Sequence, residues 1–400
     1  MKKKFNKKIF LKEIKEIRNP PLNVTSTDSY LFEHEYQINQ PALYIYELTS
    51  VSILNHFIYS SETKEILNLN FQQPGKNQIF AYFPELINLE KYSLDKKINL
   101  LKNLILKKLN LVLKVIFIYL INDFIYKIRR LIVLLKSYLA NGIDLDNGIW
   151  ITDSWRWANY FHWLTDFLPK TILLNKKYPN SKFLLPKSFL RQAPFVLSSL
   201  DLLEINYEII DEKTIYNFQN LKVLNNYSIT GNQRKSLLKE LNKSLRKIIN
   251  LDQKLAYINE MPNFLYITRK ENKNNFSSSR FIENEVEIFP ILKKFNIKTI
   301  SCEDLSFHKQ LEIFSSCNFL ISIHGAGLTN MIFMRNGGSI LELRHENDAG
   351  SNCYFSMASS LGLDYYYLCG ESINNSNIYN ANLYIDTYKF SKLLVDIINK

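Results

Sequence analysis

The sequence predicts an α/β protein with two doubly wound units, in which helices cover both faces of mostly parallel sheets. Its 400 residues, 46% of them apolar, are enough for two or three domains with substantial cores. From residue 148 onward, short strand-like segments alternate with helix-length segments, which is typical of βαβ units. Some of these segments, such as FLISI at 319–323, are apolar throughout, as strands covered on both faces are.

Residues 1–147 are expected to form an N-terminal region of a different kind. We predict short strands and loops over 1–90 and one or two long helices over 91–140, because the latter segment contains no Pro or Gly. The most hydrophobic stretch, 109–121, is interrupted by Lys114, whereas a membrane span needs about 20 apolar residues. We therefore expect a buried helix or a basic amphipathic helix that lies on an anionic membrane.

The net charge of +12 is concentrated in two segments of this region. Residues 1–18 carry +6 and residues 91–136 carry +9. Together these two segments carry +15, so the remaining residues carry −3. A nucleic-acid enzyme would need its basic residues around the chemistry, so we expect no nucleic-acid partner. The N-terminus lacks the apolar run of a secretory signal. We expect a cytoplasmic protein, with peripheral contact at the inner face of the cytoplasmic membrane.

The rest of the chain divides into two α/β units joined by a helix. The first unit, 148–230 with parts of 1–147, has predicted strands at 148–152, 182–186, 207–211 and 221–225. A charged segment at 231–258 predicts the connecting helix. The second unit, 259–400, has predicted strands at 264–268, 297–301, 319–323, 339–343 and 365–369. In such sheets a ligand binds at the carboxyl ends of the strands.

Glycines cluster in the second unit, where five of the chain's 11 lie within 26 residues: Gly325, Gly327, Gly337, Gly338 and Gly350. The segment FLISIHGAGLTN indicates a buried strand, a glycine loop and a helix. Such a loop lets the backbone approach an anion, and the first N–H groups of the helix attract it. The alternative is a tight turn that needs positive φ. The spacing matches neither the dinucleotide-binding nor the P-loop motif.

Two arginines and a glutamate are expected beside this loop. Arg269 directly follows the strand at 264–268, at the same sheet edge as Gly325. Arg280 is expected to open the next helix, where the helix dipole disfavours a cation, and where Ile282, Val286 and Phe289 recur at helical spacing. Both arginines suit a diphosphate, although solvated surface charges are the alternative. Glu342, at the end of its strand, suits ribose hydroxyls unless it is an ordinary strand-end residue.

The first unit contains one unusual cluster, DSWRWANYFHWLTDFLP at 153–169, which holds three of the four tryptophans. His162 and Asp166 are four residues apart, so they share one face of a helix. A carboxylate beside an imidazole can orient it as a general base or can itself deprotonate a hydroxyl. The aromatic side chains suit sugar surfaces, although an aromatic run more often belongs to a core.

Six of these segments together resemble glycosyltransferase family 61: NYFHWLTDFLP, YITRK, RFIENEVE, EDLSFHKQLEIF, HGAGLTN and SILEL. They occur in order over roughly residues 148–370. The family includes bacterial polysaccharide transferases, plant xylan xylosyl- and arabinosyltransferases, and animal O-linked N-acetylglucosaminyltransferases. RK stands at 269–270 where many members have RR, and residues 1–147 match nothing in the family.

The resemblance implies an inverting transferase of the GT-B type, with two facing Rossmann-like domains. The C-terminal domain would hold a nucleotide sugar, usually UDP-linked, and the acceptor would be a glycan or lipid-linked glycan in capsular polysaccharide, O-antigen or exopolysaccharide biosynthesis. His162 and Asp166 match the acceptor-side motif, where one of them would be the base. The donor-binding positions implied by the resemblance are Arg269, Arg280, His324, Gly325, Ala326, Gly327, Leu328, Thr329, Asn330 and Glu342.

A metal and other cofactors are not expected. Asp144-Leu145-Asp146 spells the D-x-D motif of another transferase architecture, but it is expected in a loop before the strand at 148–152, in the wrong half to meet a diphosphate. The alternative function is a non-catalytic nucleotide- or glycan-binding protein that keeps the glycine loop without turnover. A lipase-like hydrolase is excluded by the absence of a G-x-S-x-G motif.

Overall fold

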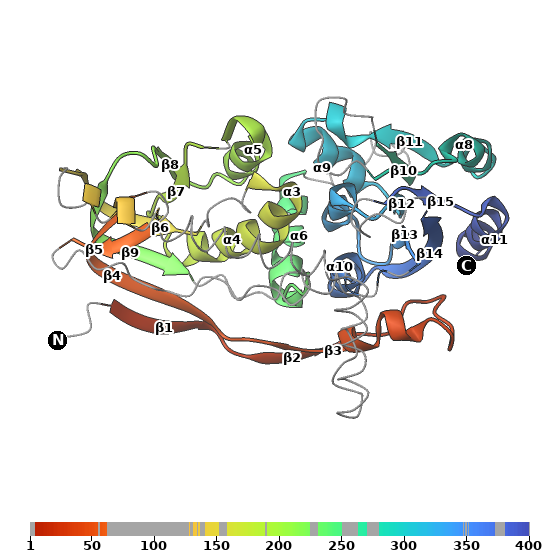
Figure 1. Cartoon of the computed structure of the whole chain (residues 1–400), viewed down its shortest axis with the longest axis horizontal. Coiled ribbons are helices and arrows are strands. Elements are labelled where there is room, and N and C mark those ends of the chain that lie inside the picture. The colour runs from red at the N-terminus through yellow and green to blue at the C-terminus, as the bar shows by residue number, and fades with distance from the viewer. Residues whose placement is uncertain are drawn as a thin grey trace.

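The computed structural model places two sheets at opposite ends of an elongated molecule (Figure 1). It describes residues 5–54, 57–61, 128, 131–133, 135–136, 141–151, 158–188, 190–224, 231–249, 263–269, 280–346, 348, 350, 352–372 and 381–399. The helices expected over 91–140 lie almost wholly outside these ranges. Among the described residues, no helix has the length and apolar character needed to cross a membrane.

The first sheet is mixed, with its parallel strands in the half that was expected to be α/β. Its order is β1 (Phe5–Leu11), β4 (Leu43–Leu54), β9 (Tyr216–Leu224), β6 (Ile143–Trp150), β7 (Phe183–Pro186) and β8 (Tyr207–Ile210), with β5 (Phe57–Ser60) paired to β4. The last four strands of that order are mutually parallel, whereas β1 and β4 join them in antiparallel pairs. The strands expected at 182–186 and 207–211 are confirmed to within one residue at their ends, whereas the strand expected at 221–225 begins five residues earlier, at Tyr216.

The second sheet has the predicted parallel strands and one antiparallel edge. Its order is β11 (Lys298–Ser301), β10 (Phe264–Thr268), β12 (Phe319–Ile323), β13 (Ser339–His345), β14 (Asp364–Ser372) and β15 (Leu383–Tyr384). Successive residues of β12 alternate between two cores, since Leu320 packs in one cluster and Ile321 in the other. Helices α9 (Phe307–Ser315) and α10 (Cys353–Leu361) belong to the first cluster, and α8 (Glu285–Lys294) and α11 (Thr387–Ile398) to the second. Both faces of this sheet are therefore covered, as predicted.

The apolar face predicted for the helix after Arg280 is wrong. Helix α8 begins only at Glu285 and turns Ile288 and Leu292 into the core, while Val286 is 77% exposed. Ile282 lies before the helix and forms a bridge with Leu383. The error arises because apolar residues occur on two sides of this short helix, and spacing alone does not tell which side meets the sheet.

Helix α6 (Lys235–Ile248) falls within the segment predicted to be helical, 231–258, and lies between the two sheets (Figure 1). Its Leu238, Leu241 and Leu245 are buried in a core cluster that includes residues of both units. Asn242 Nδ2 donates hydrogen bonds to the carbonyls of Ile332, at 2.7 Å, and Met334. The two units are thus joined by a continuous core as well as by the chain.

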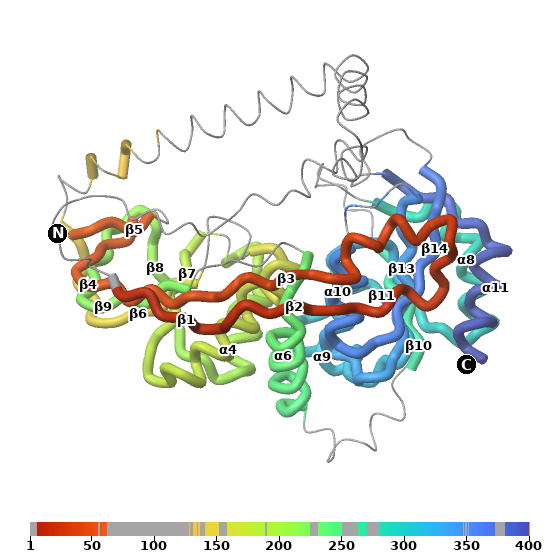
Figure 2. Tube along the Cα trace, turned by 90° about the horizontal axis from the view of Figure 1, so that it is seen from below, coloured from red at the N-terminus to blue at the C-terminus, as the bar shows by residue number. Residues whose placement is uncertain are grey.

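An N-terminal strap, defined here as residues 12–41, runs along the molecule from the first sheet to the second (Figure 2). It contains strands β2 (Ile14–Ile17) and β3 (Gln37–Gln40) and the 3-10 turns η1 (Ser29–Leu31) and η2 (Glu33–Glu35). Leu22 N–H donates to the carbonyl of Tyr365 on β14 at 2.9 Å. The residues expected to be loops and short strands therefore bridge both units.

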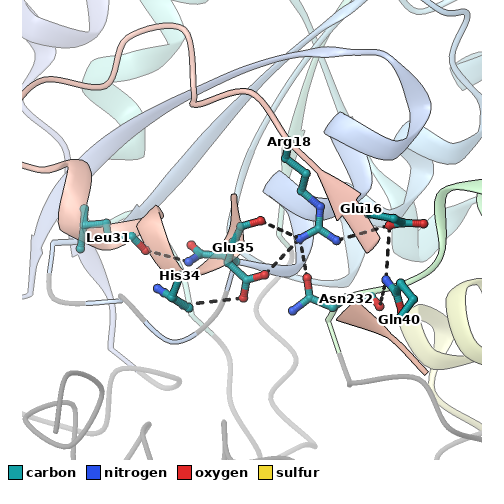
Figure 3. Close-up of polar contacts among 8 residues, drawn as sticks. Glu16, Arg18, Leu31, His34, Glu35, Gln40 and Asn232 are labelled. Carbon is teal, nitrogen blue, oxygen red and sulfur yellow. Dashed lines mark hydrogen bonds and ion pairs between the residues drawn. The ribbon is translucent and has the colours of Figure 1, made fainter. Parts of the chain in front are cut away.

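A buried ion pair attaches this strap to the start of the connecting helix (Figure 3). Arg18 Nη1 lies 3.1 Å from Glu35 Oε2 and donates to Asn232 Oδ1 at 2.5 Å. Gln40 Nε2 donates to the carbonyl of Asn232 at 2.9 Å. Burial raises the pKa of Glu35 in spite of the Arg18 charge, because removal of both groups from water opposes their attraction.

Candidate active site

His162 and Asp166 are in contact on an irregular helix of the first unit. Helix α3 (Tyr160–His162) continues into a π-helical turn, η6 (Trp163–Phe167), and then into α4 (Leu168–Lys177). His162 Nδ1 lies 2.8 Å from Asp166 Oδ2, so the expected pairing of these side chains is present. The His162 side chain is 16% exposed and that of Asp166 only 2%, so the imidazole is the more accessible member of the pair. Single π-turns inside helices are frequent at functional sites.

Gln233 holds the second oxygen of this carboxylate. Its Nε2 donates to Asp166 Oδ1 and to Thr165 Oγ1, each at 3.2 Å. Gln233 comes from the segment before α6, 67 residues further along the chain. No sequence motif marks it, so pattern analysis missed it. The carboxylate is thereby fixed on both sides, which fixes the imidazole that it orients.

The aromatic side chains around the pair belong to the core where the structure describes them. Trp163 is fully buried, and its Nε1 donates to Ser199 Oγ at 2.8 Å. Its ring stacks on that of Phe167. For Trp163 and Phe167 the alternative interpretation, that the aromatic run belongs to the core, is correct. Trp155 and Trp157 lie outside the described residues.

The glycine loop lies where the second sheet changes direction. Strand β10 has β11 on one side and β12 on the other. The chain therefore continues from β10 to one side of the sheet and from β12 to the other side, so the strand order reverses between these two strands. Ligands of open α/β sheets bind at such switch points. Arg269 follows β10, and Arg269 Nη2 donates to the carbonyl of His324, which follows β12, at 3.2 Å. Arg269 and the loop are thus together at the predicted edge.

Gly325 makes room for the Arg269 guanidinium. A Cβ built on Gly325 would lie 1.5 Å from Arg269 Nη2. The φ of Gly325 is 162°, an extended value open to any residue, so a strained turn does not explain this glycine. The following residues form the 3-10 helix η9 (Ala326–Phe333). The loop backbone therefore lies against the Arg269 guanidinium. The expectation was that Gly325 lets the backbone approach an anion directly, whereas the structure shows that it makes room for this cation.

Arg280 lies beside Arg269 but not in a helix. It precedes α8 by five residues, so the prediction that it opens this helix is wrong; the chain from Arg280 to Ile282 is extended and pairs with residues near Leu383. Arg269 Nη1 donates to the Arg280 carbonyl at 3.2 Å. Burial, together with the Arg280 charge, lowers the pKa of Arg269. Within the described ranges, neither guanidinium forms an ion pair with a carboxylate, and the buried Arg280 Nε has no hydrogen-bond partner.

Glu342 lies behind His324 rather than in an open crevice, which corrects its predicted position. It is completely buried, its Oε1 contacts His324 Nδ1, and its Oε2 accepts from Tyr365 Oη at 2.5 Å. Arg344 Nη1 donates to the same Tyr365 oxygen at 3.3 Å. Glu342 is therefore placed to act on a ligand through His324. Arg344 lies in β13 and Tyr365 in the neighbouring β14, and both strands have sequences typical of a core, which is why sequence analysis missed these residues.

The remaining loop residues differ in exposure. Ala326 is exposed and Gly327 half-buried, whereas Leu328, Thr329 and Asn330 are buried. A Cβ on Gly327 would come within 3.2 Å of Ile267, so this glycine permits close packing on β10. Because His324 and Gly325 are buried as well, Ala326 and Gly327 are the accessible residues of the HGAGLTN segment.

Side chains of α3 join this loop to the first unit. Tyr160 Oη donates to Asn330 Oδ1 at 2.6 Å, and Asn330 Nδ2 donates to Gln310 Oε1 at 2.9 Å. The ring of Tyr354 lies between the units, with its centroid 5.7 Å from that of Phe161 and 4.9 Å from that of His324. Neither tyrosine was predicted. The His162–Asp166 pair and the arginine-lined loop are thus neighbours across one interface.

The D-x-D sequence is not in a loop, contrary to the prediction. Asp144 and Asp146 are exposed residues within β6, and Asn217 Nδ2 donates to Asp144 Oδ1 at 2.9 Å. They belong to the first sheet and not to the glycine loop. Among the described residues, no group of three or more His, Cys, Asp or Glu side chains is arranged to hold a metal.

Comparison with known proteins gives one family match and several relatives that match part of the chain. The family profile described as Glycosyltransferase 61 matches residues 160–341. The chain is 37% identical over 89 residues to the EGF domain-specific O-linked N-acetylglucosamine transferase of Drosophila melanogaster, which covers 22% of the chain and 17% of that protein. It is 30% identical over 106 residues to protein O-linked-mannose beta-1,4-N-acetylglucosaminyltransferase 2 of Takifugu rubripes, covering 25% and 18%.

The same enzyme of Canis lupus familiaris is 26% identical over 157 residues, which cover 38% of the chain and 25% of that protein. The chain thus spans a quarter or less of the length of these curated relatives. Fold and site geometry define an α/β protein with two arginines beside a glycine loop, at the point where the strand order of a sheet reverses. The part of the chain that matches the glycosyltransferase family 61 profile, residues 160–341, contains His162, Asp166, both arginines and the glycine loop.

Proposed function

We propose that the protein is an inverting glycosyltransferase of the GT-B type that transfers a sugar from a UDP-linked donor to a glycan acceptor. The observation that carries the proposal is the pair of Arg269 and Arg280 at the Gly325 loop, across one interface from His162 and Asp166. Two adjacent guanidinium groups that form no ion pair with a carboxylate of the described residues suit a diphosphate. In this assignment residues 259–400 bind the donor, and residues 148–230, with parts of 1–147, bind the acceptor.

The names of the relatives support a choice of donor. Both are N-acetylglucosamine transferases, so UDP-N-acetylglucosamine is the first donor to test. The acceptor in the proposal is a surface glycan, free or lipid-linked, of capsular polysaccharide, O-antigen or exopolysaccharide biosynthesis. No metal is required in this scheme, because the two arginines supply the positive charge that the diphosphate needs.

The geometry suggests how the reaction runs. The pair of His162 and Asp166 takes the proton of the acceptor hydroxyl, whose oxygen forms a bond to C1 of the donor sugar. The bond from C1 to the diphosphate oxygen breaks on the opposite side, through an oxocarbenium-like transition state, and the configuration at C1 inverts. Arg269 and Arg280 stabilise the charge that develops on the leaving diphosphate.

A thermal-shift panel followed by a turnover assay tests the function. A ligand at 100 times its Kd stabilises a folded protein by about 2.7 kcal/mol, which is easily measured. We expect a shift with UDP and UDP-N-acetylglucosamine, and little with NAD or ATP. Transfer is then measured as UDP release in the presence of glycan acceptors. The absence of a shift with every nucleotide would refute the proposal, and a shift without any turnover would favour the non-catalytic binding protein instead.

Peripheral contact with an anionic membrane is the second part of the proposal. The described residues between 128 and 136 are helical, and four apolar ones are exposed at helical spacing: Ile128, Leu131, Ile132 and Leu135. Val133 points the other way and is buried in a cluster with Tyr59 and Ile215. Lys136 is exposed beside this apolar stripe. An apolar stripe flanked by basic residues suits the surface of an anionic bilayer.

Liposome flotation tests this contact. The protein should float with anionic vesicles at low salt and be released as salt rises, since each Lys or Arg near the surface contributes about 1 kcal/mol. Replacement of Leu131 and Leu135 by Ser should weaken flotation, whereas replacement of the exposed Val286 by Ser should not. Equal recovery with neutral and anionic vesicles would contradict the membrane proposal and leave the transferase proposal intact.

A further inference from the structure

His324 lies at the centre of the donor side of the site. It follows β12 and precedes Gly325, and its side chain is 7% exposed. Its Nδ1 contacts Glu342 Oε1, its carbonyl accepts from Arg269 Nη2, and its ring packs edge-on against Tyr354. Because Nδ1 faces Glu342, any contact of the imidazole with a ligand at the loop is made by Nε2.

Glu342 is a negative charge buried directly behind this imidazole. Burial alone would raise its pKa, but His324, Arg344 and the Tyr365 hydroxyl together hold the pKa below its usual value. A fully buried carboxylate is tolerated only where such partners surround it. The carboxylate therefore fixes a proton on His324 Nδ1 and is a ready counter-ion for a second proton on Nε2.

The charges on the other side of His324 change when the donor binds. The titratable and charged groups around the ring, apart from Glu342, are Arg269, Arg280, Arg344, His345, Tyr354 and Tyr365. Without a donor, the neighbouring Arg269 and Arg280 charges disfavour a further cation. The diphosphate of a nucleotide sugar brings two negative charges to the same place, and these favour it. The balance at His324 therefore shifts toward the doubly protonated ring upon donor binding.

We infer that His324 binds the donor diphosphate as an imidazolium, with Glu342 as its buried counter-ion, so that donor binding takes up a proton. This inference rests on the proposed function, because it takes a nucleotide sugar as the ligand of the loop. It gives His324 a direct hydrogen bond to the diphosphate and makes Glu342 a positioning residue. Affinity for the donor then falls as the pH rises, because the proton must be supplied from solution.

Isothermal titration calorimetry of UDP-N-acetylglucosamine, at one pH in two buffers of different ionisation enthalpy, measures the protons taken up. UDP-N-acetylglucosamine is the right probe because UDP has a terminal phosphate that itself titrates near pH 6. We expect the wild-type protein to take up a fraction of one proton when the donor binds near neutral pH. Uptake should vanish in His324→Gln and fall in Glu342→Gln, and the former should bind the donor about 10-fold more weakly or worse.

His308→Gln is the matched control, since His308 also contacts a carboxylate, that of Glu312, but lies exposed on α9 and should leave proton uptake unchanged. Melting temperatures identify any variant that fails to fold. If the variant of the buried Glu342 does not fold, the comparison of wild type with His324→Gln still tests the inference. Donor binding with no proton uptake, or equal uptake by wild type and His324→Gln, would overturn this inference alone. A failure of the folded protein to bind any nucleotide sugar would overturn the proposed function with it.

Discussion

Tyr160 of α3 and Asn330 of η9 are hydrogen-bonded across the interface between the two units, with 2.6 Å between Tyr160 Oη and Asn330 Oδ1. Tyr160 begins the helix that holds His162 and Asp166, and Asn330 ends the HGAGLTN segment. Gln310 of α9 completes the contact through Asn330 Nδ2. The acceptor-side pair and the donor-side loop are thus held in register by buried polar groups, rather than by apolar packing alone.

Tyr160→Phe tests this relationship. The change removes one hydroxyl and leaves Asn330 Oδ1 buried without its shortest hydrogen bond, so we expect a loss of about 1–3 kcal/mol in the free energy of unfolding. Urea denaturation measures it. Tyr207→Phe is the matched control, because the Tyr207 hydroxyl bonds Asp201 at an exposed site and its removal should cost much less. Equal losses of unfolding free energy in the two variants would show that the hydrogen bond across the interface stabilises the fold no more than an exposed one.

Arg269→Ala and Arg280→Ala should weaken donor binding while the protein stays folded. Hydrogen bonds to charged groups contribute roughly 1.5–3 kcal/mol each, which corresponds to an affinity loss of about 10- to 150-fold. Arg280→Lys should also bind less well, because an ammonium cannot reproduce the planar fork of a guanidinium. Calorimetric titration with UDP-N-acetylglucosamine gives the affinities, and Arg191→Ala, at an exposed position, is the control. Wild-type affinity in both alanine variants would show that neither arginine binds the donor.

His162→Ala or Asp166→Asn should slow turnover with donor affinity nearly unchanged. A lost general base reduces the rate by roughly 100- to 10,000-fold. His308 and Glu312 provide a control of the same type, since they form a His–carboxylate pair at the same spacing, 3.4 Å apart, on the exposed side of α9. His308→Ala should keep the parental rate. If His162→Ala and Asp166→Asn also keep it, the pair is structural and the base lies elsewhere.

Much of the second sheet could be predicted from the sequence because its strands are apolar and separated by helix-length segments. The contact of His162 with Asp166 followed from helical spacing, and the approach of Arg269 to the loop followed from the parallel order of β10 and β12. Each of these relations depends on local periodicity or on strands that neighbour in space, which is what a sequence pattern records.

The unpredicted contacts depend on residues far apart in the chain. Gln233 reaches Asp166, and Arg18 reaches Asn232 across 214 positions. The burial of Glu342 depends on Tyr365 from the neighbouring strand, so its strand position alone suggested an open carboxylate. In each case tertiary packing brings polar residues together, and the sequence around either residue does not reveal its partner.

Gly325→Ala should act on the donor through Arg269. The new methyl group would overlap Arg269 Nη2, and because the clash is with the end of a flexible side chain, the guanidinium moves and the fold survives. We therefore expect a loss of donor affinity close to that of Arg269→Ala. The decisive comparison is the double variant, because contacting residues are not additive. In an Arg269→Ala background, Gly325→Ala should cost almost nothing further. Additive losses would instead mean that the Gly325 backbone itself contacts the diphosphate, as the sequence alone suggested.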